Sequence, residues 1–123
     1  DKEQMMKRMK QVLPAPDVAL IDARPEVIDI FSAAAKEAHR NGLDGDAWEW
    51  RLYVQPWGFD LSDIQTEIGL WYGEVDHNAP VGMGHYLDEQ LPNSSLTVVQ
   101  DGGHFSTINN HIGAIFDYLA ELK

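Results

Sequence analysis

Two stretches decide the fold: Ile68-Gly-Leu-Trp-Tyr-Gly-Glu-Val-Asp-His-Asn-Ala-Pro80 and Leu96-Thr-Val-Val-Gln-Asp-Gly-Gly-His-Phe-Ser106. Each starts with a short apolar run and then passes into glycine, which is typical of a buried strand followed by a loop. Between the runs, Pro80 opens a predicted helix that ends at Pro92-Asn93. A helix that joins two strands is a crossover connection, so the strands are predicted to pair in parallel within an α/β fold.

The flanking sequence is predicted to be helical. Apolar residues recur at helical spacing within residues 5–13, 25–42 and 46–53, and again from about 107 to 122. Pro14 and Pro16 are expected to end the first of these helices. The sequence therefore predicts an all-helical segment followed by two parallel strands with their crossover and C-terminal helices.

Composition excludes several functional classes. The 123 residues are 44% hydrophobic, contain no cysteine and carry a net charge of −11, which fits one globular domain and argues against nucleic-acid or anionic-membrane partners. Without cysteine there is no disulfide or thiolate metal site, and we expect a reducing, cytoplasmic location. No apolar run approaches the ~20 residues that span a bilayer.

The charge is unevenly distributed along the chain. Residues 1–51 carry eight Lys or Arg and ten Asp or Glu, whereas residues 52–123 carry one and ten. The two parts have equal numbers of acidic residues, but the second part carries most of the net negative charge because it has only one basic residue.

A carboxylate and an imidazole follow the two predicted strands. Asp76 comes shortly after the first strand and His104 after the second, and the carboxyl ends of parallel strands lie at the same edge of a sheet. A carboxylate that accepts the Nδ1 proton leaves Nε2 free to act as a base. Two plainer interpretations stay open: Asp76 caps the helix near Pro80, and His104 is a structural loop histidine.

These loops resemble those of the α/β-hydrolase fold family. Gly73-x-x-Asp76 with Pro80 is similar to the loop of the triad acid, and Gly103-His104 before a C-terminal helix is similar to the histidine loop. The acid precedes the histidine, as in the Ser…Asp/Glu…His order of that family. The resemblance implies a helical cap over residues 1–55 and the C-terminal part of the hydrolase core over residues 56–123. It also implies catalytic roles for Asp76 and His104, and no cofactor.

The sequence departs from the family pattern at the nucleophile. It contains no Gly-x-Ser-x-Gly elbow and no His-Gly oxyanion loop ahead of the cap. We therefore expect a fragment of a hydrolase of ester or amide substrates that is inactive alone. Its nucleophile, serine or the aspartate of a dehalogenase-like member, comes from an N-terminal part of the same enzyme. That part, or a second copy of the chain, is the expected partner.

Three further features have competing interpretations. Trp48 and Trp57 either pack the cap on the core or line an apolar acyl pocket. His77 beside Asp76 lacks metal-ligand spacing, so no metal site is predicted. A non-catalytic alternative for the whole chain is an acidic interaction module or an oligomerising remnant of the hydrolase fold.

Overall fold

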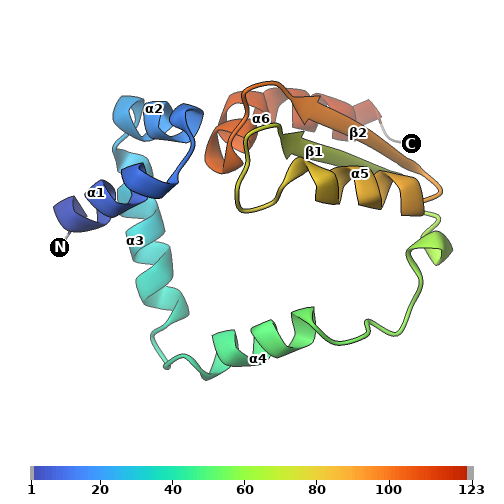
Figure 1. Cartoon of the computed structure of the whole chain (residues 1–123), viewed down its shortest axis with the longest axis horizontal. Helices are drawn as coiled ribbons and strands as arrows, with labels where there is room; N and C mark the ends of the chain where they lie inside the picture. The colour runs from blue at the N-terminus through green and yellow to red at the C-terminus, as the bar shows by residue number, and fades with distance from the viewer. Residues whose placement is uncertain (1, 122–123) are drawn as a thin grey trace.

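The computed structural model describes residues 2–121, a mostly helical chain with one small sheet (Figure 1). Its elements in chain order are α1 (Lys2–Val12), α2 (Ala15–Ala23), α3 (Glu26–Ala38), α4 (Asp44–Tyr53), the 3-10 turn η1 (Leu61–Asp63), β1 (Ile68–Gly73), α5 (Val81–Gln90), β2 (Ser94–Val99) and α6 (His104–Glu121). Leu122, at the end of the predicted last helix, lies outside the described residues. None of the helices described here has the length and apolar character needed to cross a membrane.

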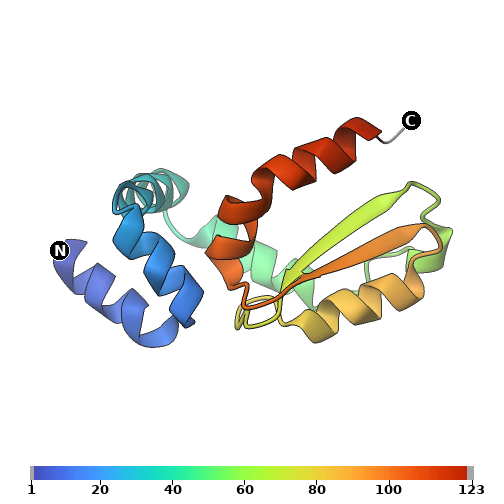
Figure 2. The ribbon, with the colours of Figure 1, turned by 90° about the horizontal axis from the view of Figure 1, so that it is seen from above.

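The sheet confirms the parallel pairing predicted from the sequence. β1 and β2 run in the same direction, from Ile68 beside Ser94 to Gly73 beside Val99. Helix α5 makes the crossover and packs against both strands, while α6 packs against β1 from the opposite face (Figure 2). The chain is thus mixed α/β, with a two-stranded parallel sheet between two helices.

The sequence did not predict helix α2. Pro14 and Pro16 do end α1, but they also begin α2, with Pro14 at its N-cap. Proline is well suited to the first turn of a helix because the N–H that it lacks would have no partner there. Helix α2 packs against both α3 and α6, so it connects the helical segment to the sheet.

A small apolar core forms where α2 meets its neighbours. Four of its buried residues lie on α2 and α3: Leu20, Ile21, Val27 and Ile28. Burying side chains of this size removes them from water and stabilises the packing of the helices by roughly 1.5–3 kcal/mol each.

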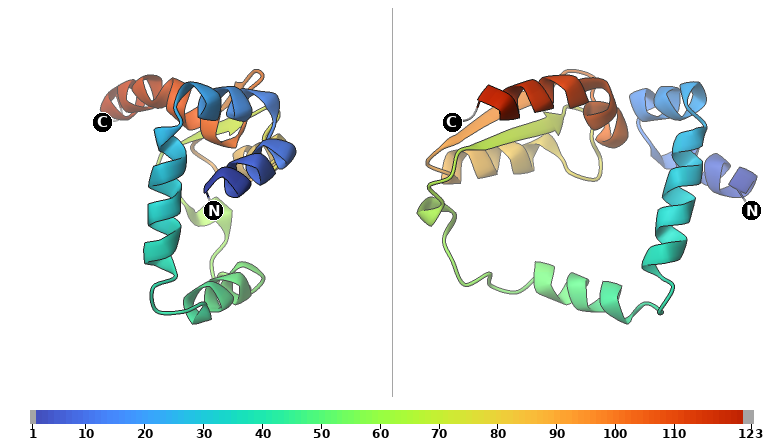
Figure 3. Two further views of the ribbon diagram at one scale, coloured as in Figure 1. Left: turned by 90° about the vertical axis from the view of Figure 1, so that its left-hand side faces the viewer. Right: turned by 180° about the vertical axis from the view of Figure 1, so that it is seen from behind.

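Helix α4 lies apart from the sheet, and residues 54–67 lead the chain back to β1 (Figures 1 and 3). The His39 Nε2 atom lies 2.6 Å from an Asp46 carboxylate oxygen, which ties the end of α3 to α4. The contact with Asp46, together with the Ala35 carbonyl, raises the pKa of His39.

Gly73 allows the two loops beyond the strands to approach one another. A Cβ atom at this position would collide with the Gly102 carbonyl oxygen and the Thr107 hydroxyl. The Val75 N–H donates to that same carbonyl of Gly102 over 2.9 Å. The loop after β1 is therefore held directly against the loop after β2.

Replacing Gly73 with alanine should destabilise the fold by about 1–3 kcal/mol, because the added methyl meets rigid backbone. The matched control is Gly82→Ala, since Gly82 lies in the first turn of α5 with open space around its Cα. Alanine is favoured there by up to about 1 kcal/mol. Urea unfolding measures both changes, and equal effects of the two substitutions would contradict the close approach.

Candidate active site

The structure brings Asp76 and His104 into direct contact. The His104 Nδ1 atom lies 2.9 Å from the Asp76 Oδ2 atom, although the residues are 28 positions apart. Asp76 is buried in the loop after β1, whereas the His104 side chain, at the first residue of α6, is 38% exposed. An imidazole between a buried carboxylate and solvent has the arrangement needed for general base chemistry.

The two oxygens of Asp76 have separate partners. Oδ1 accepts hydrogen bonds from the backbone N–H groups of Asn78, over 2.7 Å, and Ala79, over 2.9 Å. These bonds close a tight turn within the loop, as aspartate side chains often do. Because Oδ2 remains for His104, the turn contact orients the carboxylate toward the ring. Asp76 therefore closes a turn in its own loop and contacts His104, but it does not cap α5, whose N-cap residue, Pro80, makes no side-chain cap hydrogen bond.

The contact determines which nitrogen of His104 carries the proton. An ionised carboxylate only accepts hydrogen bonds, so the Nδ1–H group donates to Asp76. In the neutral ring Nε2 then has a free lone pair, and within residues 2–121 it makes no protein hydrogen bond. The pair can therefore take a proton at Nε2 while Asp76 stabilises the charge.

Helix α6 begins at His104, three residues earlier than the sequence pattern predicted. The backbone N–H groups of His104, Phe105 and Ser106 donate to the carboxylate of Asp17, over 2.9, 3.2 and 2.8 Å. The remaining N–H of this turn, from Gly103, donates to the Ser106 Oγ atom over 2.9 Å. These contacts satisfy the donors that open a helix, so the helix can start at the histidine.

Asp17 is the residue at this site that sequence reasoning missed. It lies in the first turn of α2, 87 positions from His104. An acidic residue in a first helical turn is common because it complements the helix dipole, so it gives no signal of a distant contact. A second contact from the helical segment reaches the same turn, where Phe31 packs on Phe105 with ring centroids 4.8 Å apart.

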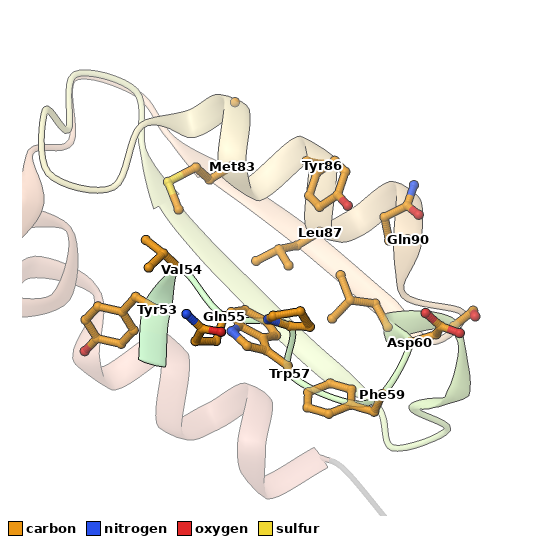
Figure 4. Close-up of a pocket in the computed structure, with 14 residues that line it drawn as sticks. Tyr53, Val54, Gln55, Trp57, Phe59, Asp60, Met83, Tyr86, Leu87 and Gln90 are labelled. Atoms are coloured by element: carbon orange, nitrogen blue, oxygen red, sulfur yellow. The ribbon is translucent and has the colours of Figure 1, made fainter. Parts of the chain in front are cut away.

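Trp48 and Trp57, the predicted substrate-binding residues, lie on other parts of the chain than the Asp76–His104 pair. Trp48 is exposed on α4, with the Arg51 guanidinium 5.7 Å from its ring centroid. Trp57 lines an open, mostly apolar groove of about 850 Å³ between residues 53–62 and α5 (Figure 4). The groove lining includes neither Asp76 nor His104. A substrate-binding role for Trp48 and Trp57 stays a prediction.

Two other kinds of site come into question within the described residues, a serine nucleophile near His104 and a metal site. Ser106, the serine nearest His104 in sequence, is buried and its Oγ atom accepts the Gly103 N–H. Residues 2–121 contain no group of three or more His, Asp or Glu side chains placed to hold a metal ion. The chemically distinctive feature is therefore the Asp76–His104 pair.

Asp76 should make folding depend on pH in the acidic range. Burial raises the pKa of its carboxyl, but the Ala79 N–H, the His104 ring and the Asn78 N–H together hold the pKa below its ordinary value. The folded state therefore binds the proton less readily than the unfolded state. Asp76 contributes stability above the ordinary pKa of about 3.9, and this contribution is lost as pH falls through the lowered value.

The test is urea unfolding of the unsubstituted chain and Asp76→Asn between pH 3 and 7. Their difference in unfolding free energy should be largest above about pH 4 and should shrink as pH falls. Asp60→Asn, which removes an exposed carboxylate from the same half, is the control and should show a much smaller change. A difference for Asp76→Asn that stays constant over the whole range would contradict the lowered pKa.

Comparison with known proteins gives one partial match to a hydrolase. No family profile matches the chain, and no solved structure matches it. Over 63 residues the chain is 27% identical to a pimeloyl-[acyl-carrier protein] methyl ester esterase from Aliivibrio fischeri (strain MJ11). The match covers 51% of this chain and 23% of the esterase. It supports a hydrolase-like relationship over about half of the chain.

Proposed function

We propose that this chain supplies the acid and the histidine of a nucleophile–histidine–acid triad in a hydrolase of ester or amide bonds. The observation that carries the proposal is the hydrogen bond between the buried Asp76 carboxylate and His104 Nδ1. The partial likeness to an esterase supports the reaction class. The acid-before-histidine order and the placement of both residues beyond parallel strands support the α/β-hydrolase arrangement.

The proposed reaction is acyl transfer. A nucleophile hydroxyl placed near His104 loses its proton to Nε2 as its oxygen attacks the substrate carbonyl carbon. The imidazolium is stabilised by Asp76 and then donates the proton to the leaving group. Water, activated by the same Nε2 atom, releases the acid from the covalent intermediate. Asp76 stays ionised throughout, which fits its lowered pKa.

The nucleophile and the oxyanion-hole donors are proposed to come from another segment of the same enzyme. The sequence contains no Gly-x-Ser-x-Gly motif, and Ser106 is occupied by its contact with Gly103. On this proposal residues 1–55 form the cap and residues 56–123 form part of the core. The 123-residue chain alone should then show no ester hydrolysis above the background reaction.

A chimera tests the proposal. Residues 1–123 replace the cap and C-terminal part of a serine-type α/β hydrolase, and turnover of a p-nitrophenyl ester is measured. His104→Ala and Asp76→Asn should each lower kcat by about a thousandfold or more, as loss of a triad member does. His85→Ala is the matched control because His85 is exposed on α5, and it should leave turnover unchanged.

Two outcomes would count against this function. Turnover that survives His104→Ala in a folded chimera would remove His104 from the reaction. A folded chimera with no turnover would favour the alternative of an acidic interaction module.

A further inference from the structure

We propose that Asp17 is a positioning residue for His104, through which the helical segment controls whether the imidazole faces Asp76. This inference deepens the proposed function and rests on it for the catalytic meaning of His104. The hydrogen bonds of Asp17 at this site go to backbone N–H groups. Asp17 acts on the backbone of the turn that carries the ring.

Both oxygens of the Asp17 carboxylate accept hydrogen bonds from the first turn of α6. Its exposed fraction is 0%, and a buried carboxylate is costly unless hydrogen bonds replace the lost water. Oδ2 accepts the His104 N–H, while Oδ1 accepts those of Phe105 and Ser106. The positive end of the α6 dipole adds to these charge-assisted bonds. The carboxylate and the helix start therefore stabilise one another.

Helix α6 has no local substitute for this contact. The residue before His104 is Gly103, which has no side chain to serve as an N-cap. A Cβ atom at Gly103 would collide with the Asp17 carboxylate, so the glycine makes room for the distant acid. Without Asp17 the first three N–H groups of α6 lose their acceptor.

His104 is thus held at two points by two carboxylates. Asp17 fixes its backbone from α2, and Asp76 holds its ring from the loop after β1. If the first turn of α6 unwinds or rotates, Nδ1 moves away from Oδ2, because the ring is attached to that turn. Asp17 belongs to the helical segment, so a displacement of α2 is transmitted to the histidine.

The pKa of Asp76, followed by carboxyl ¹³C NMR, tests this coupling. The contact with His104 helps to keep that pKa low, so Asp17→Asn should raise it, and Asp17→Leu, which offers no acceptor, should raise it further. Removing a nearby negative charge alone would lower the pKa of Asp76. The direction of the shift therefore separates lost positioning from a simple loss of charge.

The matched control is Asp22→Asn, on the same helix, whose exposed carboxylate pairs with Lys10. It should leave the pKa of Asp76 unchanged. Circular dichroism establishes whether each variant is folded. If Asp17→Leu does not fold, the test rests on Asp17→Asn, which keeps the size of the side chain. An unchanged or lowered pKa of Asp76 in a folded Asp17 variant would overturn the proposal.

A second measurement is amide hydrogen exchange in the unsubstituted chain and in Asp17→Asn. The amide hydrogens of His104, Phe105 and Ser106 should exchange at least about tenfold more slowly than in Asp17→Asn, the effect of losing one charge-assisted hydrogen bond. Rapid exchange of these amides in the unsubstituted chain would overturn the proposal whatever the variants do. Neither readout involves hydrolysis, so failure here is distinguishable from failure of the chimera.

Discussion

The parallel pairing of β1 with β2 is the constraint on which the site depends. The register places Gly73 beside Val99, so both strands end at the same edge of the sheet. The pairing continues into the loops, where the Glu74 N–H donates to the Val99 carbonyl over 3.0 Å. An antiparallel pair would send Asp76 and His104 to opposite ends of the strands. Their contact is a consequence of strand direction.

Two buried carboxylates hold His104, one through its ring and the other through its backbone. Asp76 uses one oxygen to close its own turn and the other to hold the ring, while Asp17 accepts three backbone N–H groups. These contacts satisfy two carboxylates that burial would otherwise leave unpaired. The site is therefore built partly from the sheet and partly from the helical segment. The hydrogen bonds of Asp17 lie at the contact between α2 and α6.

Sequence reasoning predicted the half of the site that depends on local pattern. The β-branched run before Asp101-Gly102 predicted β2, and the crossover helix predicted the parallel direction that joins Asp76 to His104. It missed Asp17 and α2. Pro14 gives the same signal whether a helix ends before it or begins after it, and no periodicity relates residues 87 positions apart.

The central claim, that Asp76 leaves His104 Nε2 free as a base, is tested most directly by ¹⁵N NMR of the neutral His104 ring. The proton is expected to reside on Nδ1, where it is donated to the Asp76 carboxylate, and Nε2 is expected to be unprotonated. A neutral ring protonated on Nε2 would contradict the account, because the atom assigned to take the proton from the nucleophile would already carry one.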